Sequence, residues 1–485
     1  MHLNKLLFIT CLSISATWQG QAQTDALTGA TPLSNGERER IKAELKAELL
    51  DELRTEITAK DHTPGSSQAS QTKEKTSRFQ VGGYGEAVMT RNFFSNNYLR
   101  YQNPDKYKNE SHGQFDLPHV VIWLGYNFGR GWSMGTEIEF EHGGTESAIE
   151  IEEEEGGEYE SEVERGGEVA LEQFWIQKSF SQAFNLRMGH IIVPVGATNA
   201  HHMPNEFFGV YRPEGENTIM PCTWHETGIS LWGEIGKWRY EVLFLPGLDS
   251  DRFNSKGWIH DGAGSPYEFK LATSYAGAFR VDNFSVPGLR LSLSGYIGNS
   301  FSNTLYNRSN ARWDKVHGTV MIGAFDFAYD AHNWIIRGNF DYGHLTDSEM
   351  ITSFNSSMSS SSVSAKQPIA SDALAAGCEA GYDFFALSKK LKEKKQRFYL
   401  FGRYDYYDSM YKTAASVARR KWCGRQRLAI GLNYYPIKSI AVKAEYGIGI
   451  LNPYTVITDA GTVTRNYNNE PSVSLGITYT GLFTK

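Results

Sequence analysis

The sequence predicts an all-β fold, a sixteen-stranded antiparallel transmembrane β-barrel with an N-terminal periplasmic α-helix. Three observations predict it: sixteen short segments of alternating apolar and polar residues, a regular alternation of long and short connections between them, and a secretory signal at the start. The composition agrees, since 13% of the 485 residues are aromatic and 47 are glycine. After the signal no run approaches the roughly 18 to 20 apolar residues of a membrane-spanning helix, which excludes a helical membrane protein.

Three segments precede the predicted barrel. Residues 1–22 are typical of a secretory signal, with a basic start, an apolar run and small residues before the expected cleavage site. Residues 23–60 are expected to contain a periplasmic helix, because apolar residues recur at every fourth position: Ile41, Leu45, Leu49, Leu53 and Ile57. This stripe favours a short coiled coil between copies of the chain, and a solitary solvated helix is the alternative. Residues 61–78 are expected to form a flexible linker.

Residues 79–485 are expected to form the barrel. The predicted strands are 79–90, 116–128, 132–142, 168–180, 184–193, 223–235, 237–246, 267–280, 288–299, 316–329, 333–344, 373–386, 397–407, 425–436, 439–450 and 472–483. Long connections such as 91–115 and 194–222 alternate with short ones such as 129–131 along the whole series. This is typical of an outer-membrane barrel, whose periplasmic turns are short and whose external loops are long.

The last predicted strand shows the two faces expected of a barrel wall. Val473, Leu475, Ile477, Tyr479 and Phe483 share one face, while serine and threonine residues occupy the other. One face can meet lipid and the other water. Sixteen strands enclose an interior too wide for side chains to fill, so an aqueous lumen is expected.

Charge is divided unevenly along the chain. The formal net charge is −7, but residues 137–168 hold 14 glutamates and one arginine. The acidic residues 146–164 fall in a predicted external loop, where a solvated acidic loop is expected and bound Ca²⁺ or Mg²⁺ is the alternative. A basic cluster at the external end of strand 425–436 is suited to gathering anions or binding lipid phosphates: Arg419, Arg420, Lys421, Arg425 and Arg427. Nucleic acid is not an expected partner of an exported chain.

Several motifs in the predicted barrel resemble those of one known family. They are LRMGHIIVPVG from Leu186, then MPNEFFG, RPEGENTIMP and TWHETGISLWG, and later FYLFGRYDYYD and LAIGLNYYPIKSIAVKAEYG. These stretches resemble the corresponding regions of the phosphate-selective porin O and P family, in versions similar to those of Bacteroides-type outer membranes. The resemblance covers most of the barrel. It implies sixteen-stranded homotrimeric channels whose third external loop folds inward to narrow the pore.

The third long connection contains charges that such a loop would bring to a pore constriction: Glu206, Arg212, Glu214 and Glu216. His201 and His202 lie close to them in the sequence. Adjacent histidines without nearby cysteine or aspartate clusters lack the spacing of metal ligands, so we expect them to be polar loop residues. No metal or cofactor is predicted in the barrel.

Because successive side chains of a strand point to opposite faces, the alternation along each strand gives a second set of predicted lumen charges. They are the charged residues on the face opposite the apolar one. The basic members are Arg187, Arg239, Lys270, Arg290, Arg337, Arg403, Arg425, Arg427 and Lys443. The acidic members are Glu137, Glu139, Glu141, Glu241, Glu268, Asp341, Asp405 and Glu445. Rings of one charge sign select the opposite ion, and guanidinium groups hold phosphate or carboxylate through two hydrogen bonds. For each single residue taken alone, a solvated wall charge is the favoured interpretation.

No catalytic motif such as GxSxG, HExxH or a Walker loop is found, so no enzyme is predicted. The expected function is a porin in the outer membrane of a Gram-negative bacterium, in contact with lipid and lipopolysaccharide, that lets small hydrophilic solutes diffuse passively. A preference for anions or phosphate is the narrower expectation. A structural or adhesive barrel that anchors surface or periplasmic partners is the alternative.

Overall fold

The computed structural model describes residues 78–483 except 102, 145–146, 154–158, 166, 264–270, 304–311, 361, 363, 459–460 and 466–468. The predicted signal, the predicted helix and the linker up to residue 77 lie outside the described residues. Among the helices in the described part of the chain, none combines the length and the apolar character needed to cross a membrane.

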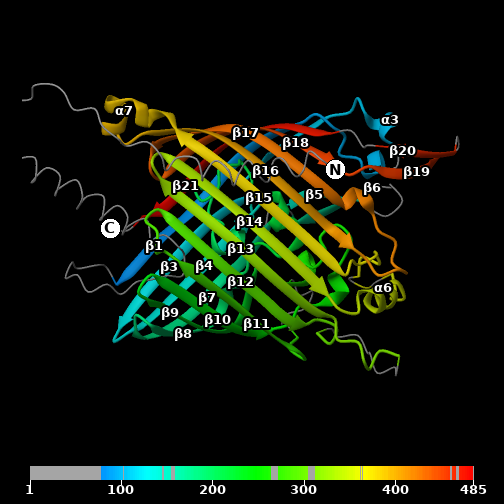
Figure 1. Ribbon diagram of the computed structural model, residues 1–485, viewed down its shortest axis with the longest axis horizontal. Helices are drawn as coiled ribbons and strands as arrows, with labels where there is room; N and C mark the ends of the chain where they lie inside the picture. Colours follow the sequence, from blue (N-terminus) through cyan, green and yellow to red (C-terminus); the bar gives the residue numbers. More distant parts are fainter. Residues whose placement is uncertain are drawn as a thin grey trace, which may run out of the picture. The chain divides into compact units, whose positions relative to one another are not determined.

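Sixteen antiparallel strands close into a barrel in the described part of the chain (Figure 1). β1 completes the ring by pairing with β3 on one side and with β21 on the other. The sixteen are β1 (Phe79–Asn92), β3 (His119–Gly129), β4 (Trp132–Glu141), β7 (Glu168–Ser181), β8 (Phe184–Ile192), β9 (His225–Ile235), β10 (Trp238–Pro246), β11 (Tyr275–Asn283), β12 (Leu289–Asn299), β13 (Thr319–Ala331), β14 (Trp334–Leu345), β15 (Asp372–Asp383), β16 (Arg397–Lys412), β17 (Gly424–Ile437), β18 (Ile440–Leu451) and β21 (Glu470–Leu482). The predicted sixteen-stranded antiparallel barrel is confirmed.

Five shorter strands accompany the barrel. β2 (His112–Asp116) pairs with the outer end of β1, and Leu117 and Pro118 separate it from β3. Proline has no backbone N–H to donate to the ladder, which accounts for the interruption. Two hairpins lie in the long connections, β5 (Ser147–Glu153) with β6 (Tyr159–Arg165), and β19 (Tyr454–Thr458) with β20 (Gly461–Arg465).

One predicted strand requires correction. The segment predicted as 267–280 begins at Tyr275 and continues to Asn283. Its neighbour β10 ends at Pro246, which lies opposite Tyr275, so no partner strand is available before that residue. Glu268 and Lys270 therefore precede the strand, and both lie outside the described residues.

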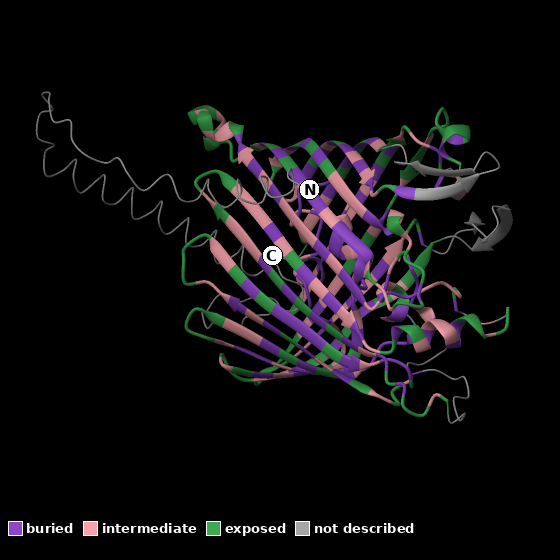
Figure 2. Cartoon of the chain, turned by 45° about the vertical axis from the view of Figure 1, so that its right-hand side comes forward, coloured by how far each residue is buried: buried purple, intermediate pink, exposed green. Residues whose placement is uncertain are grey.

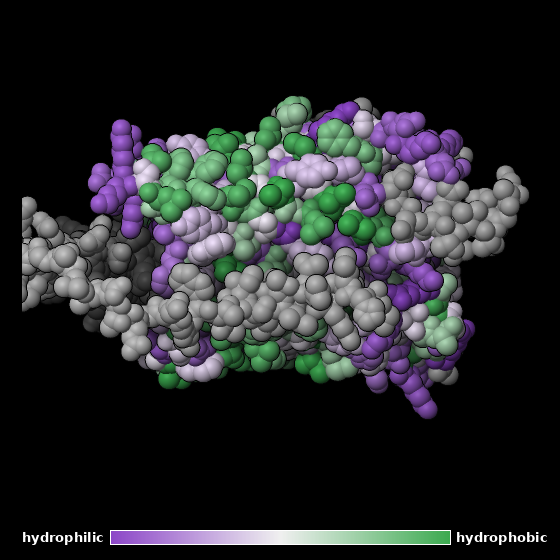
Figure 3. Space-filling view, turned by 45° about the horizontal axis from the view of Figure 1, so that its top comes forward, coloured by the Kyte–Doolittle hydropathy of each residue, from purple (hydrophilic) through white to green (hydrophobic). Residues whose placement is uncertain are grey.

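The outer face of the barrel is apolar. Buried residues alternate with more exposed ones along the barrel strands (Figure 2). Many of the exposed ones are large and hydrophobic. Figure 3 shows hydrophobic side chains gathered over the wall and hydrophilic ones towards the ends. Trp132, Trp238 and Trp334 each begin a strand directly after a tight turn and are exposed. An apolar band flanked by interfacial aromatic residues is the surface that a bilayer requires.

The long connections lie at one end of the barrel and the tight turns at the other. Most of the helices lie in the long connections: α3 (Pro104–Tyr107), α4 (Ala197–Ala200), α5 (Glu214–Ile219), α6 (Ser348–Ser356), and the 3-10 turns η1 (Tyr98–Tyr101), η2 (Ser250–Arg252), η3 (His260–Ala263) and η5 (Lys421–Cys423). The connection between β15 and β16 is the exception to the tight turns at the other end, because it contains η4 (Phe384–Leu387) and α7 (Lys389–Glu393) (Figure 1). Apolar residues of the long connections, among them Val193, Trp224, Phe253 and Trp258, form one buried cluster with inward-facing wall residues such as Leu243. Part of the interior is therefore filled by loops.

Candidate functional site: the barrel lumen and its inward loop

The connection between β8 and β9, residues 193–224, folds into the barrel, and we call it the lumen loop. Its two ends are joined by the N–H of Val193, which donates to the carbonyl of Trp224 at 2.8 Å. Gly196 then meets the wall, where its carbonyl accepts from Arg280 of β11 at 2.9 Å and its N–H donates to Ser294 of β12 at 3.0 Å.

The two short helices of the lumen loop brace one another. Glu216 in α5 accepts hydrogen bonds from the N–H and the hydroxyl of Thr198 in α4, at 2.9 and 2.7 Å. Gly196 has φ +83°, and a Cβ there would lie 1.5 Å from the Glu216 carboxylate. Only glycine satisfies both the backbone conformation and the space at this position.

The tip of the lumen loop, residues 204–210, is anchored on another part of the wall. Lys443 of β18 donates to the carbonyls of Pro204, Phe207 and Gly209 at 2.5, 2.9 and 2.9 Å. The N–H groups of Phe208 and Val210 donate to Glu379 of β15 and Glu445 of β18, at 3.2 and 3.1 Å. A loop that starts beside β11 and β12 and is anchored at β15 and β18 spans the lumen.

The side chain of Phe208 fits a specific recess in this wall. It stacks on Phe401 of β16 with ring centroids 5.2 Å apart. A Cβ at Gly381 of β15 would lie 2.3 Å from the Phe208 ring, so the neighbouring strand can carry only glycine there. Packing and hydrogen bonds together hold the tip in one place.

The four charges predicted at the constriction differ in their surroundings. Glu214 stays partly exposed, paired with Arg427 at 2.7 Å, and Glu206 is half-buried. Arg212 and Glu216 are buried: Arg212 donates to the carbonyl of His202 at 3.3 Å, and Glu216 holds Thr198. The side chains of Arg212 and Glu216 are used inside the loop, which leaves them little exposed to the lumen. For all four residues a role at the pore constriction stays a prediction.

The histidine pair is split between two environments. His201 donates through Nδ1 to Glu206 at 3.0 Å and accepts through Nε2 from Arg290 of β12. His202 points to the other side, where Nδ1 donates to the carbonyl of Asn199 at 3.3 Å. Burial, and Arg290 beside it, hold the pKa of His201 well below its usual range. Burial also lowers the pKa of His202 to about 4. Both rings are therefore neutral at neutral pH.

Glu206 is expected to make the charge of the lumen respond to pH. Burial raises the pKa of Glu206 to about 7, although the Arg290 guanidinium opposes the shift. Lowering the pH from about 8 to about 6 therefore neutralises a carboxylate in the lumen. The expected result is a shift of the reversal potential towards anion preference at the lower pH. Glu206→Gln should abolish this pH-dependent shift of the reversal potential. A shift of the same size in that variant would show that Glu206 is not the group that titrates.

A row of arginines and carboxylates crosses neighbouring strands of the wall; we call it the arginine row. Its members are Arg187 of β8, Arg239 and Glu241 of β10, Arg280 and Asp282 of β11, Arg290 of β12 and Asp326 of β13. The antiparallel register sets Glu241 opposite Arg280 and Arg239 opposite Asp282. Ion pairs of 2.8 to 3.9 Å connect each member to the next.

The other predicted lumen charges in the described part of the chain also lie at inward-facing positions. Arg337 pairs with Glu379 at 2.6 Å, and Arg403 with Asp405 at 2.6 Å. The remaining ones are Glu137, Glu139, Glu141, Asp341, Arg425, Arg427, Lys443 and Glu445. These side chains therefore lie on the lumen side of the wall, as the alternation along their strands predicts, and their role in selectivity stays a prediction.

Several further inward charges were not predicted, among them Glu86, Glu172, Arg280, Asp282, Asp326 and Glu379. Glu86, Arg280, Asp326 and Glu379 follow the alternation of their strands and could have been found by it. Asp282 lies beyond the predicted end of its strand. Glu172 faces inward because of a register shift between Glu137 and Ile138 of β4, which alternation cannot reveal.

No protein-family model matches the chain. A protein of Aquifex aeolicus (strain VF5) described as uncharacterized is 26% identical over 395 residues, which cover 79% of this chain and 78% of that protein. Among solved structures, the anion-selective porin from Comamonas acidovorans has 10% identity and a TM-score of 0.47, covering 83% of this chain and 99% of its own. The outer membrane channel DcaP of Acinetobacter baumannii has 12% identity and a TM-score of 0.46, with 83% and 97% covered. Salmonella typhi OmpF has 10% identity and a TM-score of 0.47, with the same coverage.

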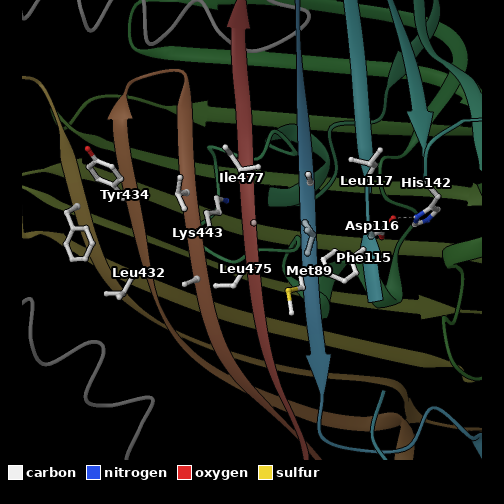
Figure 4. A pocket seen from close by; sticks show the side chains of 16 residues that line it. Met89, Phe115, Asp116, Leu117, His142, Leu432, Tyr434, Lys443, Leu475 and Ile477 are labelled. Atoms are coloured by element: carbon white, nitrogen blue, oxygen red, sulfur yellow. Dashed lines mark hydrogen bonds and ion pairs between the residues drawn. The ribbon is translucent and has the colours of Figure 1, made fainter. Parts of the chain in front are cut away.

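A groove of about 790 Å³ lies on the wall near the junction of β2 and β3 (Figure 4). Outward-facing apolar residues of β1, β17 and β21 line it, including Met89, Leu432 and Leu475. Its polar rim contains Asp116 and His142, which pair at 2.8 Å. The apolar lining belongs to the outer face of the wall and does not line the lumen.

Proposed function

We propose that the protein is a porin of a Gram-negative outer membrane that lets small hydrophilic solutes diffuse through its lumen. One observation carries the proposal: a closed barrel has an apolar outer belt, while its inward face is charged and crossed by an inward loop. An apolar exterior suits lipid, and the charged interior of a sixteen-stranded barrel suits water and polar solutes. Passive diffusion requires no chemical step.

We further propose a preference for anions. In some of the paired charges of the wall, the guanidinium is more exposed than its carboxylate. The exposed fraction of the side chain is 15% for Arg290 against 1% for Asp326. It is 24% for Arg337 against 7% for Glu379. At these two pairs a solute in the lumen therefore meets the cationic partner first, and guanidinium groups bind phosphate or carboxylate with two hydrogen bonds.

Recording currents of the purified protein in planar lipid bilayers under asymmetric KCl tests both proposals. We expect stepwise insertion of conducting units and a reversal potential that indicates anion preference. Added phosphate should reduce the chloride current if the lumen binds phosphate, as the family resemblance implies. Correctly folded protein without conductance would contradict the porin and favour a structural or adhesive barrel.

Arg337→Gln is expected to reduce the anion preference. The substitution removes a guanidinium that reaches solvent and leaves Glu379 without its ion-pair partner, so the lumen becomes more negative. The reversal potential should move towards cation preference. Arg91→Gln is the matched control, since Arg91 is exposed on the outward-facing side of β1. Equal reversal potentials for the two variants would contradict a role for Arg337.

We also propose that the channel is a homotrimer, as the resemblance to the porin O and P family implies. The mass of the detergent-solubilised protein, measured by light scattering with the detergent subtracted, should be that of three chains. A monomeric mass would contradict this proposal and leave the channel proposal intact.

A further inference from the structure

A cluster of acidic side chains lies on the wall formed by β1, β4 and β7, away from the arginine row. Its centre is Glu137 of β4, Glu172 of β7 and His202 of the lumen loop, whose ligand atoms all lie within 4.8 Å of one another. All three side chains are buried. The strands and the loop come from separate parts of the sequence, so only the fold brings these groups together.

A register shift directs Glu172 into this cluster. Glu137 lies opposite Gln173, whereas the next residue of β4, Ile138, lies opposite Leu171, so Glu172 is the extra residue. Such a bulge turns a side chain from its regular direction, and bulges are frequent beside functional sites. The carboxylates of Glu172 and Glu137 consequently lie on the same, lumen-facing side of the wall.

The cluster contains ligand atoms that have no hydrogen-bond partner among the described residues. His202 donates through Nδ1 to the carbonyl of Asn199, which leaves the lone pair on Nε2 of the neutral ring, and Nε2 has no partner. Oε1 of Glu137 and the hydroxyl of Tyr84 are also without partners, although both residues are buried. A histidine that donates one ring N–H to a backbone carbonyl presents its other nitrogen in the manner of a metal ligand.

The charges around the cluster do not balance. Glu137, Glu139 and Glu172 supply three carboxylates, and Arg212 is the cation beside them. When the carboxylates are ionised, two negative charges remain in a buried setting, where unpaired charge is costly. A bound divalent cation would balance them.

We propose that Glu137, Glu172 and His202 bind a divalent transition-metal ion, Zn²⁺ or Mn²⁺. The set of two carboxylates and one neutral imidazole suits these ions, whereas Ca²⁺ and Mg²⁺ are usually bound by oxygen atoms alone. The adjacent histidines lack ligand spacing in the sequence, but the fold supplies His202 with two carboxylates from other elements.

Acidic side chains connect this site to the external end of the barrel. Glu137, Glu139 and Glu141 follow at every second position of β4 and face the lumen. Glu139 and Glu141 form a second set of close ligand atoms with His119 of β3. Beyond β4 the chain enters the glutamate-rich residues 146–164. A row of carboxylates that leads inward from the external end of the barrel attracts cations towards the buried site.

The bound ion would hold the lumen loop to the wall of β4 and β7, because His202 belongs to the loop and the two glutamates to the wall. This inference does not depend on the channel proposal. Metal binding is measured on the purified protein, with or without conductance.

The test is a titration of chelator-treated, full-length protein with Mn²⁺, followed by electron paramagnetic resonance, and with Zn²⁺ by calorimetry. We expect one tight site per chain that discriminates against Ca²⁺. Glu137→Gln and His202→Gln should each weaken binding at least about tenfold. Glu234→Gln, at the tight-turn end of β9, is the matched control and should bind as the parent does. Heat-modifiable migration in gel electrophoresis reports whether each variant has folded.

A deletion of residues 146–164 separates this site from the external acidic loop. We expect the deletion variant to keep the tight site. Loss of tight binding in the deletion variant, equal affinity in Glu137→Gln and the parent, or no stoichiometric binding to the parent would each overturn the proposal. In the last case the cluster would be a set of carboxyl groups that share protons.

Discussion

Lys443→Met is expected to release the tip of the lumen loop from the barrel wall. The ammonium group of Lys443 is 1% exposed and donates to three loop carbonyls. Methionine keeps much of the side-chain volume but cannot donate, so three buried carbonyls lose their partner. The expected loss of docking free energy is on the order of 3 kcal/mol. The ratio of docked to released loop then falls roughly 100-fold.

Two measurements report this release. The single-channel conductance should rise, because the tip no longer spans the lumen, and chymotrypsin should cleave after Phe207 or Phe208, both of which are buried in the parent. Lys438→Met is the matched control, since Lys438 lies in the turn between β17 and β18. Parent-like conductance and protease resistance in Lys443→Met would show that the tip is held by other contacts.

Asp326→Asn is expected to disrupt the arginine row and to strengthen anion preference. Asp326 is fully buried and accepts hydrogen bonds from Arg280 and Arg290 at 3.0 and 2.9 Å. Asparagine removes the negative charge and leaves two guanidinium groups without their shared partner. Breaking a buried ion pair by removing one partner costs about 3 to 5 kcal/mol. The barrel should therefore unfold at a lower denaturant concentration.

The same substitution adds one net positive charge to the lumen wall. We expect the reversal potential to move further towards anion preference than in the parent. Asp330→Asn is the matched control, because Asp330 is exposed at the turn end of the same strand. If Asp326→Asn and Asp330→Asn have the same unfolding midpoint and reversal potential, the arginine row does not have the role assigned to it.

The strands could be predicted because their signal is local. A period of two in the side-chain pattern and a turn at each end are read from a dozen consecutive residues, and all sixteen barrel strands were found in this way. The error at β11 has a different origin. Its start is determined by where β10 ends, at Pro246, and a partner strand is not visible in the segment itself.

The lumen charges were partly predictable for the same reason. Alternation identifies that Arg239 and Glu241 face inward, but it does not tell which carboxylate each arginine meets. That choice depends on the register between strands that are distant in sequence, such as Asp282 beside Arg239. Alternation also fails at Glu172, where the register shift changes the direction of the side chain.

The sequence by itself determined the strand number and the side of the wall on which most charges lie, because alternation is a property of neighbouring residues. The inward fold of the third long loop was implied by the resemblance to the porin O and P family. The tertiary structure alone decided where that loop is anchored and which of its charges are buried. It buries Arg212 and Glu216 within the loop, holds the tip on Lys443, and sets His202 beside Glu137 and Glu172. These contacts join residues far apart in the chain, and only barrel closure and register bring them within bonding distance.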